Sequence, residues 1–218
     1  MKKREKGESN RQFKAKRRGL LLNSLGIFFL AAGILRIIVL ISLGDLRYFI
    51  WFSNNVLLVI GAGILMHSRL IVTAELCIAL IPETLWSIDL IGKLLFNRYI
   101  FGVTGYVFEK GFALSAMSSL QHLLIVPLGL FALWFLGSSR DAWKFSFLHV
   151  SLLWIFGFLI GEKYNLNCVF HYCIGYFKDL NNYMLAWPLI VLFIILLSNL
   201  IIQALDFLKK KKYGPEVR

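Results

Sequence analysis

A long apolar stretch, residues 70–92, contains three carboxylates that could do chemistry. At about 100° per residue, they share one helix face, roughly 120° wide, with a proline and a tryptophan. The residues on this face are Glu75, Pro82, Glu83, Trp86 and Asp89. An ionisable residue inside a membrane span is costly, about 2.5–3.5 kcal/mol on insertion scales. We therefore expect this face to point into a helical bundle or a water-filled cavity.

Two further apolar stretches contribute polar side chains at matching depths. Ser115, Ser118, Ser119 and His122 follow the i, i+3, i+4, i+7 spacing of one helix face. Ser53, Asn54 and Asn55 open an earlier stretch. At about 1.5 Å per residue, Glu83 and His122 each lie about 14 Å below the outer membrane surface, and the two asparagines about 10 Å. These depths predict one polar layer around a cavity that opens outward.

This layer suggests catalysis of acyl transfer. His122 is the candidate general base, Ser53 or a serine of 115–119 the nucleophile, and Glu83 or Asp89 the group that orients the imidazole. The candidate substrate-binding residues are Asn54, Asn55, Trp86, Ser115, Ser118 and Ser119. Two alternatives stay open. Glu83, Asp89 and His122 could relay protons in a small transporter, or the polar layer could only hold a non-catalytic bundle or partner subunit together.

Other polar residues have simpler interpretations. Glu75 could pair with Arg36 of the first apolar stretch, and His149 is expected to be solvated near the cytoplasmic interface. Cys168 and Cys173 flank His171, a pattern that allows a local disulfide or two unpaired thiols. A zinc site would need a fourth ligand, and none is adjacent. We expect no metal and no cofactor.

The elements that must position these residues are six apolar stretches: 19–43, 48–66, 70–92, 113–137, 144–161 and 185–205. Each is near the 17–25 residues with which a helix crosses a bilayer. Runs such as 189–197 do not alternate as the strands of a membrane barrel do. The sequence predicts an all-α, polytopic membrane bundle of six helices.

The distribution of charge predicts the topology. Hydrophobic residues make up 58% of the 218 and charged residues 17%, with a net charge of +12. Six spans place 17 basic residues on the side of the termini and six on the other, so both termini should be cytoplasmic. The membrane domain would be 19–205, between basic tails at 1–18 and 206–218. These tails favour anionic lipids as partners and argue against a nucleic acid.

Two short segments resemble a known family. Tyr48-Phe49-Ile50-Trp51-Phe52-Ser53-Asn54 resembles the Y-F-T-x-x-S-N motif of the androgen-induced-gene and FAR-17a-like membrane proteins, and His122 with Pro127 resembles their H-x₄-P motif. The resemblance implies about six helices and, in some members, hydrolysis of lipid esters by an intramembrane Thr and that His. Ile50 occupies the Thr position, and Ser53 lies one turn further on. The expected location is the plasma membrane of a bacterium or archaeon, with a membrane-protein partner as a further possibility.

Overall fold

The computed structural model describes residues 2–109, 112–171 and 183–214, and every regular element in these ranges is helical. The long helices are α1 (Lys2–Ser42), α2 (Phe52–Leu65), α3 (Arg69–Phe96), α5 (Phe112–Leu136), α6 (Ala142–Ile160) and α7 (Tyr183–Tyr213). The short ones are α4 (Gly105–Glu109) and the 3-10 turns η1 (Leu46–Ile50), η2 (Glu162–Tyr164) and η3 (Leu166–Cys168). The predicted all-α class is confirmed.

Five of the described helices are long and apolar enough to cross a membrane: α1 from Ala15 onward, α3, α5, α6 and α7. The sixth apolar stretch, expected at 48–66, is shorter as a helix. Its first residues form the turn η1, so α2 has 14 residues. At about 1.5 Å per residue, α2 is about 21 Å long, less than the roughly 30 Å of hydrocarbon in a bilayer.

The exposed surface of the bundle is apolar, as contact with lipid requires. On α7, for example, Leu185, Leu189, Phe193 and Leu200 are all exposed. In water such a surface would be an aggregation liability, whereas in a bilayer it contacts lipid tails. Together with the five long apolar helices, this surface indicates a membrane protein.

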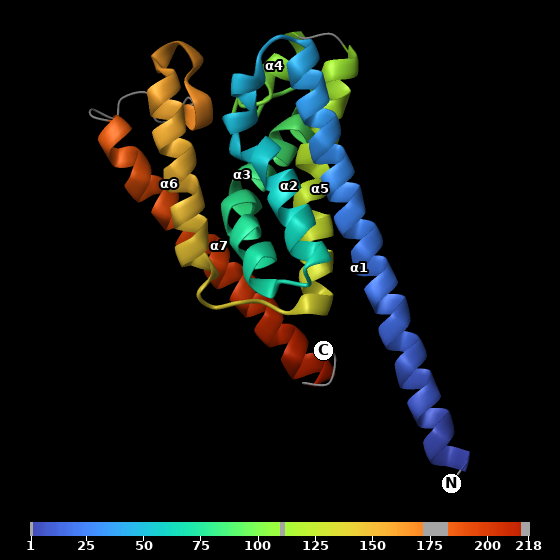
Figure 1. The fold of residues 1–218 in the computed structure, drawn as a ribbon. Coiled ribbons are helices and arrows are strands. Elements are labelled where there is room, and N and C mark those ends of the chain that lie inside the picture. Colours follow the sequence, from blue (N-terminus) through green and yellow to red (C-terminus); the bar gives the residue numbers. More distant parts are fainter. Residues whose placement is uncertain (1, 110–111, 172–182, 215–218) are drawn as a thin grey trace.

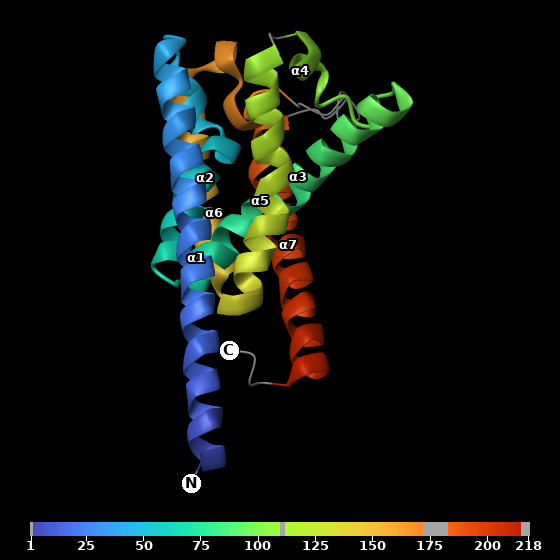
Figure 2. The same cartoon turned by 90° about the vertical axis from the view of Figure 1, so that its right-hand side faces the viewer.

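Helix α3 is the centre of the bundle. In its most apolar stretch 61% of the residues are buried, against 22% to 28% in the other four candidate spans. It contacts α2, α5, α6 and α7 and lies obliquely to α1, α5 and α7 (Figure 2). Polar residues on α3 therefore meet protein side chains rather than lipid.

The two ends of the bundle differ. We call the end that carries η1, α4, η2 and η3 the loop face; there α1 ends and α2 begins (Figure 1). We call the opposite end the terminal face, because the start of α1 and the end of α7 both lie there (Figure 1). Helices α1 and α7 continue unbroken through the expected domain boundaries at 18/19 and 205/206.

Helices α1 and α2 are packed closely through glycines. A Cβ at Gly61 of α2 would lie 2.8 Å from the backbone nitrogen of Leu30 and 3.1 Å from the carbonyl oxygen of Gly26. A Cβ at Gly33 of α1 would lie 2.4 Å from the Leu58 side chain. Small residues allow membrane helices to approach closely where the hydrophobic effect does not drive association. These glycines therefore fix the position of α2, which carries Ser53 and Asn54.

We predict that Gly61→Ala destabilises the protein by about 1–3 kcal/mol, because the new methyl group meets the backbone of α1. The matched control is Gly19→Ala, at a helical position of α1 where a Cβ meets nothing within 4 Å. That change should be neutral or stabilise by about 0.5–1 kcal/mol. The measurement is the thermal midpoint in detergent micelles. Equal effects of the two changes would contradict close packing at Gly61.

Candidate functional site

A buried acid–imidazole pair joins α3 to α5. The Oε2 atom of Glu83 contacts Nδ1 of His122, and the side chains are 1% and 10% exposed. The other carboxylate oxygen of Glu83 is buried with no hydrogen-bond partner among the described residues. A carboxylate at Nδ1 favours the tautomer with its proton on that nitrogen, which leaves Nε2 as an acceptor. The proximity expected from the depths of the two residues is confirmed.

The imidazole of His122 is also held by aromatic residues. The Trp86 ring stacks on it, with ring centroids 4.1 Å apart and planes inclined by 25°. The indole Nε1 of Trp86 donates to the hydroxyl of Tyr106 at 3.0 Å. Because Tyr106 belongs to α4, this hydrogen bond ties the short helix of the loop face to the pair. Helix α3 thus holds the His122 ring directly, through Glu83 and Trp86, and α4 supports it through Tyr106.

A second polar cluster lies beside the first, around Asn54. The Oδ1 atom of Asn54 accepts from Arg36 Nε at 3.0 Å and from Gln121 Nε2 at 3.1 Å, and its Nδ2 donates to the Tyr48 carbonyl. It therefore connects α1, α2 and α5. Gln121 was not singled out from the sequence, although a Gln next to His122 inside an apolar stretch was a usable signal.

Other predicted site residues organise the loop face. Asp89 accepts five hydrogen bonds from the segment after α3: Oδ1 from the N–H groups of Ile100, Phe101 and Gly102, and Oδ2 from the N–H and hydroxyl of Thr104. Asn55 donates to the Phe49 carbonyl at 2.9 Å. These contacts give Asp89 and Asn55 a structural task that the sequence did not reveal.

The structure describes the candidate serines only in part. Ser53 is buried in the first turn of α2, and no hydrogen bond among the described residues links it to His122. Ser119 is half-buried in α5. The side chains of Ser115 and Ser118 lie outside the described residues.

A second acid–imidazole pair lies nearer the terminal face. Glu75 Oε1 is 2.9 Å from His149 Nδ1, which joins α3 to α6. The expected partnership of Glu75 with Arg36 is wrong, because Arg36 bonds to Asn54 instead. The expectation that His149 is solvated is also wrong: its side chain is 19% exposed. Like Glu83, Glu75 has one buried carboxylate oxygen without a partner among the described residues.

Surface contacts on the loop face are electrostatic. Arg47 donates to Asp45 at 2.7 Å, and this hydrogen bond holds the pKa of the Asp45 carboxyl below its usual range. The guanidinium also lies 3.9 Å from the ring centroid of Tyr164 in η2.

Cys168 is disulfide-bonded and Cys77 is a free thiol, whereas Cys173 lies outside the described residues. Within the described ranges, no group of three His, Cys, Asp or Glu side chains could hold a metal ion.

Two pockets lie elsewhere in the bundle. One, of about 320 Å³, is formed by α1, α2 and α5, and includes Leu57 and Gln121. The other, of about 80 Å³, lies between Phe52, Pro82 and Trp187. Neither is lined by Glu83, His122 or Asp89, so the outward polar cavity expected from the sequence stays a prediction.

In its described residues, the fold is that of a helical membrane protein. Its central helix, α3, carries the acids of two acid–imidazole pairs. No family model, curated protein or solved structure matches the chain.

We predict that Asp89→Ala opens the segment 100–104, because four backbone N–H groups lose their acceptor. Hydrogen bonds to a charged group contribute about 1.5–3 kcal/mol each, so amide hydrogen exchange in this segment should accelerate at least tenfold. Glu162→Ala, at an exposed acid of the same face, is the control. Unchanged exchange in Asp89→Ala would show that the loop is held by other contacts.

Proposed function

We propose that the protein is an intramembrane enzyme that hydrolyses, or transfers the acyl group of, a lipid-like ester. The observation that carries this proposal is the placement of His122 between Glu83 and Trp86 within an apolar bundle. A histidine oriented by a carboxylate is the general base that acyl transfer requires. A site enclosed by apolar helices favours a substrate that arrives from the bilayer.

In the proposed reaction, Nε2 of His122 takes the proton from an attacking hydroxyl, and the carboxylate of Glu83 stabilises the imidazolium that forms. The imidazolium then returns the proton to the leaving alcohol. Ser53 is the proposed nucleophile within the chain: its oxygen bonds to the acyl carbon as the ester C–O bond breaks, and water or an acceptor alcohol, deprotonated by His122, then releases the acyl group from Ser53. If it does not act, the attacking hydroxyl is that of water in a hydrolase or of an acceptor alcohol in a transferase.

The resemblance to the androgen-induced-gene and FAR-17a-like proteins supports this proposal. His122 and Pro127 occupy the positions of the family H-x₄-P motif, and some members hydrolyse lipid esters. The family Thr is replaced by Ile50, and Ser53 offers a hydroxyl one turn further along the chain. Asn54, Trp86 and the serines 115, 118 and 119 stay proposed substrate-binding residues.

One observation favours a proton-coupled transporter as the second candidate. The acids of the two pairs, Glu75 and Glu83, are both on α3. They are eight residues apart, which is about 12 Å along the helix. Acid–imidazole pairs in series are a feature of intramembrane proton relays. A non-catalytic bundle or partner subunit, in which both pairs only join helices, is the third candidate.

For the topology, we propose six spans with both termini in the cytoplasm and the plasma membrane as the location. The start of α1 and the end of α7 lie at the same face of the bundle, as an even number of spans requires (Figure 1). In this topology α2 is a short sixth span, and the excess of basic residues lies on the cytoplasmic side. The two basic tails then lie where anionic lipid headgroups can bind them.

We predict that His122→Ala lowers hydrolysis of a fluorogenic long-chain ester, such as 4-methylumbelliferyl oleate, by about 10²–10⁴-fold, the usual contribution of a general base. Glu83→Gln should lower it at least tenfold, because the imidazole loses the carboxylate that orients it. A fluorophosphonate probe should label the purified wild-type protein only while His122 is present, if a serine is the nucleophile.

The matched control is His149→Gln, which removes the imidazole of the other pair. It should leave ester hydrolysis unchanged, with the thermal midpoint of each variant measured alongside. The transporter would be the supported function under two conditions. The wild-type protein would not hydrolyse the ester, and it would carry protons into liposomes in a way that Glu75→Gln abolishes. Loss of folding in both His variants, without either activity, would favour the packing role.

We predict that green fluorescent protein fused to either terminus fluoresces, since it folds in the cytoplasm. Alkaline phosphatase fused after Lys163 should be active, because the proposed topology places η2 outside, and the same enzyme fused after Ser138 should be inactive. If green fluorescent protein fluoresced at one terminus and not at the other, the number of spans would be odd. That result would contradict the six-span arrangement.

A further inference from the structure

The pocket formed by α1, α2 and α5 is apolar and lies on the flank of the bundle. It has a volume of about 320 Å³, at the lower end of the range of ligand pockets. Its rim includes Phe28 and Leu35 of α1 and Leu120 of α5, which are 44%, 51% and 56% exposed. A pocket between exposed apolar residues of membrane-spanning helices opens sideways, toward lipid. Its first neighbours in a membrane are acyl chains.

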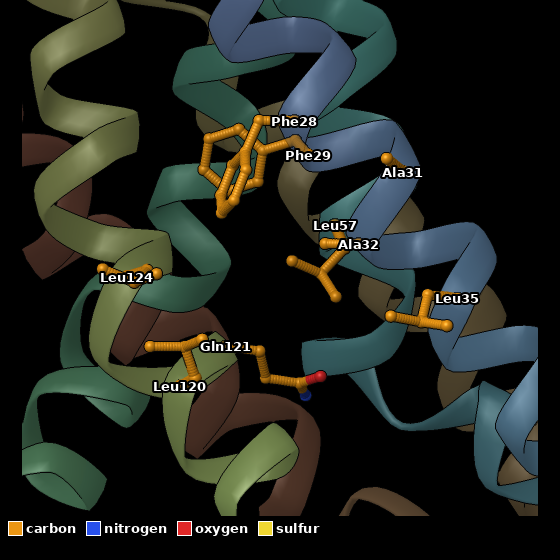
Figure 3. A pocket seen from close by; sticks show the side chains of 9 residues that line it. All are labelled: Phe28, Phe29, Ala31, Ala32, Leu35, Leu57, Leu120, Gln121 and Leu124. Carbon is orange, nitrogen blue, oxygen red and sulfur yellow. The ribbon is translucent and has the colours of Figure 1, made fainter.

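The pocket has one polar end. Figure 3 shows the amide of Gln121 near Leu35, at the opposite end of the pocket from Phe28 and Phe29. Because α1 runs toward the loop face, Leu35 lies nearer that face and Phe28 nearer the middle of the helix. An amphiphile in this pocket would have its head toward the loop face and its tail toward the bilayer centre.

A cation that has no ion-pair partner among the described residues lies at this polar end. Arg36 follows Leu35 in α1, and its Nε bonds to the same oxygen of Asn54 that accepts from Gln121. Among the described residues, Arg36 forms no ion pair, and its Nη1 and Nη2 atoms donate no hydrogen bond. Four described carboxylates of the loop-face half have other partners: Asp45 with Arg47, Asp89 with the 100–104 segment, Glu83 with His122 and Glu162 with His171. Among the described residues, the positive charge therefore has no carboxylate partner.

We propose that this flank pocket binds a phospholipid of the leaflet at the loop face, with one acyl chain between α1 and α5 and its phosphate at Arg36. The guanidinium offers parallel N–H donors that match phosphate oxygens, and such charge-assisted hydrogen bonds are strong. Gln121 can donate to the ester region while the apolar wall covers the chain. The lipid supplies the anion that the described residues do not.

The inference is independent of the proposed catalysis. Neither Glu83 nor His122 lines the pocket, and binding is measured without turnover. A lipid here acts as a bound ligand that fills the space between α1 and α5. Variants of the acid–imidazole pair and of the pocket therefore separate the two proposals.

The test is native mass spectrometry of the full-length protein released from micelles that contain a defined lipid. Wild type should retain one phosphatidylglycerol and bind diacylglycerol, which lacks the phosphate, about tenfold to hundredfold more weakly, as expected for lost hydrogen bonds to a charged group. Arg36→Gln should weaken phosphatidylglycerol binding by the same factor. Arg98→Gln, at an exposed arginine of the loop face, and Glu83→Gln should bind as wild type does.

Ala32→Phe tests the pocket without touching the charge, because it fills the wall of α1 with an aromatic ring. It should reduce the binding of both lipids and leave the thermal midpoint close to wild type, which keeps the test valid if Arg36→Gln fails to fold. Equal retention of the two lipids, unchanged binding in Ala32→Phe, or an equal loss in Arg98→Gln would each overturn the proposal.

Discussion

The burial of three carboxylates on one central helix constrains the rest of this structure. A membrane interior has no water to solvate Glu75, Glu83 or Asp89, so each needs a partner from another element. The three have different partners: an imidazole of α6 for Glu75, an imidazole of α5 for Glu83, and the backbone after α3 for Asp89. The positions of α5, α6 and the loop segment relative to α3 follow from these contacts.

The same constraint explains the polar contacts of the loop face. Asp89 organises the 100–104 segment, and that segment leads into α4, whose Tyr106 accepts from Trp86. On the other side of α5, Asn54 ties α1 to α2 and α5. Polar contacts of the loop face thus converge on His122 and Gln121, two consecutive residues of α5. Close glycine contacts between α1 and α2 hold Asn54 in place without using any polar group.

Much of this arrangement could be predicted from the sequence. Helical periodicity placed Glu75, Glu83, Trp86 and Asp89 on one buried face of α3, and depth counting brought Glu83 and His122 together. Partners from other helices could not be predicted this way, because periodicity describes one helix and not which neighbour it meets. Glu75 therefore received the wrong partner. The shortened α2 also escaped prediction, since an apolar 3-10 turn and an apolar helix have the same composition.

The two acid–imidazole pairs have the same chemistry but different surroundings. The residues around Glu75 join helices: Ser146 donates to the Ala74 carbonyl at 2.8 Å, and Cys77 contacts Asn199 of α7. Around His122, the stacked Trp86 fixes the ring plane, and the neighbouring Gln121 donates to Asn54, which also accepts from Arg36. The proposed role of an oriented base therefore falls to His122, whose ring is held by both a carboxylate and a stacked indole, rather than to His149.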